Sequence, residues 1–381
     1  MKEKTYIAQY DHYILFIYFI LIFIGLYMQL NISSVRTSMF FFYRQFMWFI
    51  ISGGAVYYTF KVVDISKLRR YSFFLILFTV LLLIAVLIFG KSVKGAVRSI
   101  QIWKFNFQPS LIARIVLILY FSHFLDKKQR LIPDSKPSQF IKNFSALIIM
   151  TAIIYSLILA ERHFSPLVIS GFTLLSILFL AKIRFLTIFL IIAIFLVGGI
   201  IVLKSGPVYR SERMQIFHKY SLYSEEDPED KYEGTNDYQI REGLISLSSG
   251  KLFGTGATRG TGKHYFLPEA KTDFIFAIIG EERGFFGAVI VILLYVWLFI
   301  RCVISSWQKD SLFLKLFGVG LGMNIFFNAM VNIGVSMAAL PSTGVTLPFI
   351  SYGGTSLLVN SLTIGLLLNI SSEKKRYFLN A

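Results

Sequence analysis

Ten long apolar runs dominate this sequence and restrict what it can fold into. They cover roughly residues 12–30, 39–60, 71–90, 111–125, 143–160, 164–182, 185–203, 273–303, 312–340 and 352–370. A helix crosses the hydrocarbon core of a bilayer in about 20 residues, so most of these runs are long enough to span one. Charged residues make up 15% of the chain, against about 25% in soluble domains. The sequence therefore predicts an all-α polytopic membrane protein with about ten transmembrane helices.

Individual runs carry further expectations. The fourth, 111–125, is short and is expected to extend into its flanks. The eighth and ninth are long enough to be tilted or broken, and glycines such as Gly280, Gly284 and Gly287 permit close helix contact or a break. The first run lacks a small-residue cleavage site, so we interpret it as a retained span rather than a removed signal peptide.

Basic residues mark alternate loops and set the orientation. Lys and Arg exceed Asp and Glu in loops 61–70 and 126–142, in the turn 182–184 and in the C-terminal tail. The positive-inside rule puts these loops, and both termini, in the cytoplasm. The same distribution argues against nucleic-acid binding as the reason for the net charge of +17. We expect one integral membrane domain over residues 1–381, with a large extracytoplasmic loop, 204–272, between the seventh and eighth helices.

Three carboxylates lie at the outer end of the eighth run. An unbroken helix would place Glu281 about 12 Å below Asp273 and rotated by only about 80°, with Glu282 on the opposite side. Intramembrane acids usually face a cavity and are functional. The alternative is structural: Thr272 or Asp273 could cap the helix, and an acid there favours the helix dipole. Both glutamates could instead pair with basic groups.

Other polar residues gather on the outer side. Pro341 and Pro348 exclude a regular helix before the last run, and non-helical backbone at membrane depth is tolerated where it is buried or lines a cavity. An ordinary connecting hairpin is the alternative. Hydroxyl residues there could bind a sugar or phosphate: Ser342, Thr343, Thr346, Ser351, Thr355 and Ser356. Arg44 either snorkels to the interface or points into the same outer cavity.

Several ordered motifs resemble the SEDS family, the group of FtsW, RodA and SpoVE. They are RQFMW at 44–48, GAVR at 95–98, QPS at 108–110, YQIREGLISLSSG at 238–250, GTG at 254–256, LPEAKTDFIFAIIGEERGFFG at 267–287, NIGV at 332–335 and LPSTGVTLPFISYGGTSLL at 340–358. The resemblance covers nearly the whole chain. Within the family, residues 268–282 and 342–356 look closer to the division member, FtsW.

The resemblance implies a peptidoglycan glycosyltransferase in the bacterial cytoplasmic membrane. Such an enzyme polymerises lipid II at the outer face, with inversion at the sugar C1, beside a class B penicillin-binding protein and other divisome or elongasome proteins. The family's essential acid corresponds to Asp273, as a base or as a ligand of a divalent cation, Mg or Mn. Candidate substrate-binding residues are Arg44, Arg98, Lys104, Gln108, Ser110, Arg210, Arg213, Lys263, Glu281, Ser351 and Ser356.

The chain also departs from the family pattern. Ser99 stands where the family usually has Trp, Leu111 where it has Glu, and Arg114 where it often has Lys. Residues 161–166, ERHFSP, replace the commoner QPDLGT-like turn. These changes favour a remodelled cavity wall, because the blocks around Asp273 and 340–358 are intact.

Two other functions remain open at this stage. An intramembrane acid, an interfacial arginine and broken helices also suit a lipid II flippase or transporter. The substitutions at Ser99 and Leu111 also suit a non-catalytic scaffold that activates a penicillin-binding protein. Against a transporter, the polar residues concentrate on the outer side, and no inverted repeat is visible.

Overall fold

Each of the ten apolar runs forms a helix. The structure is a computed structural model, and it describes residues 3–35, 39–90, 92–93, 96–102, 105–133, 136–204, 208–220, 235–257, 260, 262 and 270–378. The ten helices are α1 (His12–Val35), α2 (Phe40–Lys61), α4 (Ser72–Phe89), α5 (Pro109–Lys127), α7 (Ser145–Ala160), α8 (Phe164–Leu180), α9 (Phe185–Lys204), α12 (Ile275–Trp307), α13 (Leu312–Ser336) and α14 (Gly354–Ser371). The fourth run does extend into both flanks, with Pro109 pre-organising its first turn.

Shorter elements connect these helices. They are α3 (Ile65–Arg70), the 3-10 helix Gln129–Leu131, α6 (Pro137–Asn143), α10 (Val208–Tyr220) and α11 (Thr235–Ser249). Outer loop 91–110 contains two antiparallel pairs, β2 (Ser92–Val93) with β3 (Ala96–Val97) and β4 (Ile100–Ile102) with β5 (Phe105–Phe107). The terminal strands β1 (Glu3–Gln9) and β6 (Glu373–Phe378) also pair antiparallel, with Glu3 opposite Phe378.

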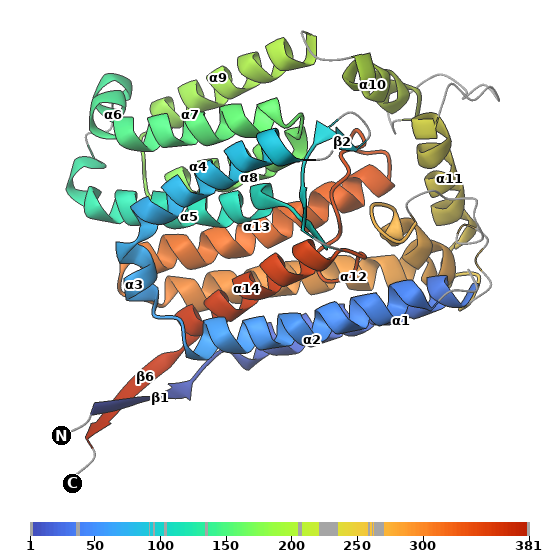
Figure 1. Ribbon diagram of the computed structural model, residues 1–381, viewed down its shortest axis with the longest axis horizontal. Coiled ribbons are helices and arrows are strands. Elements are labelled where there is room, and N and C mark those ends of the chain that lie inside the picture. Colours follow the sequence, from blue (N-terminus) through green and yellow to red (C-terminus); the bar gives the residue numbers. More distant parts are fainter. Residues whose placement is uncertain are drawn as a thin grey trace.

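The long helices run roughly along one direction, so the connections collect at two ends (Figure 1). Both termini, α3 and α6 lie at one end, and β2, α10 and α11 lie at the other. This separation agrees with the orientation that the basic loops predict. The end with the termini is the cytoplasmic end, and the strand pairs of loop 91–110 belong to the outer end.

Six of the described helices are by themselves long and apolar enough to cross a bilayer: α1, α4, α5, α12, α13 and α14. Helices α6 and α7 meet at 80° and add a seventh if they form one bent span. Helix α8 and the stretch Phe185–Gly199 of α9 are shorter apolar helices. The all-α membrane fold is confirmed, and the number of ten crossings stays a prediction.

Polar contacts fix the helices to one another. Helices α5, α13 and α14 are largely buried, whereas α4 is largely exposed, so the first three form the centre of the bundle. Asn369 of α14 donates to the Thr59 and Val63 carbonyls at the end of α2, at 2.9 and 2.7 Å. Tyr18 of α1 hydrogen-bonds Ser361 of α14 at 3.0 Å. Such contacts hold apolar helices together where lipid removes the usual hydrophobic drive.

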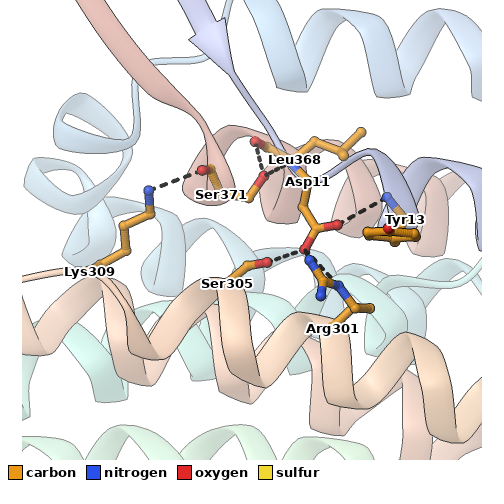
Figure 2. A network of polar contacts seen from close by, with 7 residues as sticks. All are labelled: Asp11, Tyr13, Arg301, Ser305, Lys309, Leu368 and Ser371. Atoms are coloured by element: carbon orange, nitrogen blue, oxygen red, sulfur yellow. Dashed lines mark hydrogen bonds and ion pairs between the residues drawn. The ribbon is translucent and has the colours of Figure 1, made fainter.

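The cytoplasmic end is closed by a network around Asp11 (Figure 2). The Asp11 carboxylate accepts from Arg301 Nη2 at 2.7 Å, from Ser305 Oγ and from the backbone N–H of Tyr13. Ser371 Oγ accepts from the Asp11 backbone N–H at 3.2 Å. The Asp11 carboxylate therefore joins the beginning of α1 to the last turns of α12, and the Asp11 backbone N–H adds the end of α14.

Helix α12 is broken at Gly284, one of the glycines that the sequence suggested. Gly284 has φ +68° and ψ −167°, a backbone that glycine adopts without strain. The break leaves helix backbone groups without helical partners, and the segment 251–256 supplies replacements. Thr255 N–H donates to the Glu281 carbonyl at 2.9 Å, and Phe285 N–H donates to the Lys251 carbonyl at 2.8 Å. The broken helix therefore anchors part of the large outer loop.

Candidate active site

Asp273 lies in the turn that precedes α12, and hydrogen bonds from two other segments hold this turn in place. Ser351 Oγ donates to the Thr272 carbonyl at 2.5 Å, and Asn332 Nδ2 donates to the Asp273 carbonyl at 2.8 Å. The helix N-cap is Phe274, with no side-chain cap bond. Neither Thr272 nor Asp273 occupies the N-cap position, so the expected capping role is wrong. The half-buried Asp273 still lies one residue before the cap, where an acid favours the helix dipole, and this part of the structural alternative stays open.

Gly344 brings Asp273 and Arg98 together. A Cβ atom placed on Gly344 would lie 3.3 Å from Arg98 Nη1 and 3.6 Å from Asp273 Oδ2. Gly344 has φ +70°, where a side chain would be strained as well as in the way. The Asp273 carboxylate and the Arg98 guanidinium therefore both approach the backbone at Gly344. Arg98 directly follows the hairpin β2–β3.

A cavity of about 290 Å³ has Gly344 in its lining. Its lining comes from α2, β5, α5, α8, α13 and the segment before α14: Arg44, Trp48, Asn106, Gln108, Leu111, Arg114, His163, Pro166, Ile169, Asn328, Gly344, Val345, Thr346, Tyr352, Gly353, Gly354, Thr355 and Ser356. Among the described residues of this lining, the side chains that carry a full charge are arginines, so the cavity is suited to an anion.

Arg114 is the most unusual group in the cavity. Its side chain is buried, its Nη1 donates to Asn328 Oδ1 at 3.0 Å, and its Nε has no partner among the described residues. Leu111, one turn earlier and also in the lining, offers it no carboxylate. Buried cations are normally paired with acids. A guanidinium held by a neutral amide keeps donors available for a bound anion.

Arg44 reaches the cavity from α2, as one of the two alternatives for this residue proposed. It hydrogen-bonds Tyr352, and its guanidinium lies 6.0 Å from the centre of the Phe40 ring. Burial raises the pKa of Tyr352, so its hydroxyl stays neutral. The structure thus brings Arg44 and Arg114 to one cavity from helices that are far apart in sequence.

His163, in the turn between α7 and α8, lies beside the QPS motif. Its Nδ1 is 3.3 Å from Gln108 Nε2 and 3.3 Å from Ser110 Oγ. Burial and the guanidinium groups of Arg98 and Arg114 lower the pKa of His163 well below its usual value. The ring is therefore neutral at physiological pH.

Glu161 begins the same turn and is fully buried. Neither of its carboxylate oxygens has a partner among the described residues. Burial raises the pKa of Glu161 to about 8, so the group is mostly protonated near pH 7. The ERHFSP turn therefore carries a buried neutral acid, Glu161, and a neutral imidazole, His163, and the imidazole lines the cavity.

The two other acids of the opening stretch of α12 serve a different purpose. Glu281 is buried and accepts from Gly262 N–H at 3.1 and 3.2 Å, so it holds the outer loop and lies outside the cavity lining. Because α12 begins only at Ile275, the helical geometry behind the expectation that Glu281 shares a cavity with Asp273 does not extend back to Asp273. Neither acid is in the lining of this cavity, and a shared site for the two stays a prediction. Glu282 contacts Asn31 of α1, in line with its expected structural role.

The remaining candidates divide into several groups. Gln108 and Ser356 line the cavity, and Ser356 Oγ lies 2.9 Å from Thr346 Oγ1. Ser351 is buried and binds Thr272 and the Leu347 N–H, so it shapes the turn rather than the cavity surface. Lys104 and Lys263 lie outside the described residues, and for Arg210 and Arg213 only the backbone, in α10, is described.

The described residues offer little for a resident metal ion. No group of three His, Cys, Asp or Glu side chains comes together among them. Mg²⁺ is often held by one or two carboxylates together with phosphate oxygens of a substrate. Asp273 could supply one such carboxylate, and the phosphate ligands would have to come from a bound substrate.

Sequence reasoning missed His163, Trp48 and Tyr352 as parts of the cavity, and it noted Arg114 only as a departure. No metal-ligand spacing marks His163, because a neutral ring that hydrogen-bonds an amide and a hydroxyl needs none. The departures from the family pattern at Leu111, Arg114 and 161–166 were the informative signal, since they converge on one wall of the cavity.

Comparisons with known proteins agree with this architecture. The family model described as "Cell cycle protein", which groups FtsW, RodA and SpoVE, matches residues 10–376. A probable peptidoglycan glycosyltransferase FtsW from Coxiella burnetii is 32% identical, over 98% of this chain and 99% of its own length.

Two solved structures share the fold. A chain of a peptidoglycan synthase complex, from work on how polymerization and crosslinking are coordinated, superposes with a TM-score of 0.74 at 22% identity, covering 96% of this chain and 98% of that chain. The rod shape determining protein RodA of Thermus thermophilus superposes with a TM-score of 0.68 at 22% identity, covering 96% and 97%.

Proposed function

Since the chain belongs to the FtsW/RodA/SpoVE family of cell cycle proteins, we propose that it is a peptidoglycan glycosyltransferase that polymerises lipid II at the outer face of the cytoplasmic membrane. The observation that carries this proposal is the pairing of an outer-side carboxylate, Asp273, with an adjoining cavity whose charges are both cationic. Glycosyl transfer from a lipid pyrophosphate needs these two features, a base and a site for the departing anion.

The proposed reaction assigns each group a role. The oxygen of the acceptor sugar's 4-hydroxyl bonds to C1 of the donor sugar, and Asp273 accepts the proton of that hydroxyl. The bond from C1 to the pyrophosphate oxygen breaks, and the pyrophosphate leaves with the electron pair. Arg98, Arg114 and Arg44 stabilise the negative charge that develops on it. A single attack of this kind inverts the configuration at C1. If Mg²⁺ or Mn²⁺ takes part, Asp273 contributes one ligand.

The cavity also bears on the alternatives. A flippase needs a path that reaches the inner side, whereas this cavity is lined by residues of the outer ends of the helices. A scaffold is favoured only by Ser99 and Leu111. Arg114 and Leu111 both line the cavity, so this wall keeps a cation, which supports a remodelled wall over a lost one. We therefore place the enzyme first.

The test uses the full chain in lipid nanodiscs, with and without a class B penicillin-binding protein, supplied with labelled lipid II and Mg²⁺ or Mn²⁺. Asp273→Ala is expected to reduce glycan polymer at least about 100-fold, because the general base is lost. Asp310→Ala removes an exposed acid in the cytoplasmic turn between α12 and α13 and should leave the yield unchanged.

The other outcomes separate the alternatives. Polymer that persists in folded Asp273→Ala would remove Asp273 from its assigned role. Translocation of lipid II in vesicles without polymer would support the flippase. Polymer that depends only on the partner's own active site would support the scaffold.

A further inference from the structure

The two hydrogen-bond partners of His163 determine which of its ring nitrogens carries the proton. Gln108 and Ser110 flank Pro109 at the first turn of α5, and both reach Nδ1 of His163 at 3.3 Å. As the Gln108 amide is oriented in the structure, its Nε2 faces Nδ1, and because this nitrogen can only donate, Nδ1 accepts in this arrangement. A neutral imidazole that accepts at Nδ1 carries its proton on Nε2.

The surroundings keep the ring neutral. Arg98 and Arg114 are the charged groups that act on it, and burial adds to their effect by lowering the pKa of His163. Glu161, two residues earlier in the turn, is itself mostly protonated near pH 7. Arg44 contributes a further cation to the cavity lining from α2. No described acid in this lining would stabilise an imidazolium.

The Nε2–H group is therefore the part of His163 that can serve the cavity. The ring belongs to the cavity lining, and Nδ1 is already occupied on the α5 side. Among the described residues, no side chain hydrogen-bonds Nε2. The neighbouring guanidinium of Arg114 has an unpartnered Nε in the same buried region. His163 and Arg114 both line this cationic cavity, and a ring N–H together with a guanidinium is a donor set that suits the oxygens of a phosphate group.

We propose that Gln108 and Ser110 act as positioning residues that hold His163 in the Nε2–H tautomer, and that His163 then donates a hydrogen bond to a phosphate oxygen of the ligand beside Arg114. The ligand identity rests on the proposed function, in which this phosphate belongs to the pyrophosphate of a lipid-linked sugar. The tautomer itself does not depend on that function. Because the ring is neutral, it can donate this hydrogen bond without transferring a proton to the bound anion.

The first experiment reads the tautomer directly. Protein labelled with ¹⁵N-histidine is studied by NMR in nanodiscs, and the His163 signals are identified by their loss in His163→Gln. The five histidines of the chain make this assignment practicable. Correlations between ring nitrogens and ring protons should show Nε2 protonated and Nδ1 unprotonated. A protonated Nδ1 at neutral pH would overturn the proposal, whether or not the protein polymerises lipid II.

Adding inorganic pyrophosphate tests the donor role. The Nε2 resonance of His163 should shift on titration, and the shift should be lost in Arg114→Met. The His12 ring, at the cytoplasmic end of α1, is the internal control and should not respond. Saturation with pyrophosphate is established from binding that depends on Arg114. If the His163 signal is unchanged at saturation, His163 is excluded as a hydrogen-bond donor to phosphate.

Variants separate positioning from structure. His163→Ala should reduce kcat/KM for lipid II by roughly 10- to 100-fold, the usual cost of losing a hydrogen bond to a charged group. His163→Gln, whose amide can still donate, should recover part of that loss. Gln108→Glu keeps the size but offers an acceptor to Nδ1, so it should move the proton to Nδ1 in the NMR spectrum and raise KM.

Two results in folded variants would contradict this scheme. The first is equal loss in His163→Ala and His163→Gln, which would indicate packing alone. The second is a Gln108→Glu variant with the wild-type tautomer and reduced activity, which would give Gln108 a role separate from His163. His12→Ala is the matched histidine control and should match the wild type throughout.

Discussion

The two ends of the bundle treat buried charge differently. At the cytoplasmic end, the acids have partners: Asp11 binds Arg301 and Ser305 (Figure 2). Asp126 binds Arg69. At the outer cavity, Arg114 has an amide partner and a free Nε, and Glu161 has no partner among the described residues. Matched charges join helices, whereas unmatched ones cost stability and are retained where a ligand or proton will use them.

The largest expected effect tests the unmatched cation. Arg114→Met keeps an unbranched side chain of similar length but removes the guanidinium from the cavity. We expect polymerisation of lipid II to fall about 100-fold or more, since charge on the leaving pyrophosphate loses a buried donor. Thermal stability should stay equal or rise, because an incompletely paired buried charge is removed. Activity and melting temperature in nanodiscs measure both. A strongly destabilised Arg114→Met would show that this arginine is structural.

The matched pair should give the reverse result. Asp11→Ala removes the acceptor of Arg301 and Ser305 and the group that caps the start of α1. We expect a loss of roughly 2–3 kcal/mol in unfolding free energy, below the range for a fully buried pair because Arg301 is partly exposed. Polymerisation per folded molecule should be unchanged. Activity that falls while stability is retained would link this network to catalysis and remove the contrast between the two ends.

The smallest effect concerns Glu161 and depends on pH. Burial raises the pKa of Glu161 in the folded protein to about 8, from an ordinary value of 4.5. Between these values the unfolded chain releases the proton that the folded chain keeps, so the Glu161 contribution to stability declines as pH rises through this window. Glu161→Gln removes that decline. Relative to wild type, its melting temperature should rise between pH 5 and pH 8 and level off above. A difference independent of pH would mean that Glu161 is ionised in the folded protein.

Much of the architecture could be predicted from local patterns. Hydrophobic runs and basic loops depend on neighbouring residues only, and all ten runs are helices whose ends differ by a few residues from the expected ones. The break in the eighth run was foreseeable from its glycines, although only the structure places it at Gly284. The expectation that Glu281 and Asp273 share a cavity assumed one continuous helix, whereas a turn that helical periodicity does not reveal separates Asp273 from α12.

By itself, the sequence determined that the chain is a helical membrane protein, which way it faces, and that Asp273 lies at the outer mouth of its eighth helix. These properties follow from hydropathy, charge distribution and ordered motifs. Only the tertiary structure decided which groups come together in the outer cavity. Arg44, Arg114 and His163 come from three separate parts of the chain, and their meeting depends on how α2, α5 and α8 pack. Side-chain pairing across such distances is set by packing, which no local pattern records.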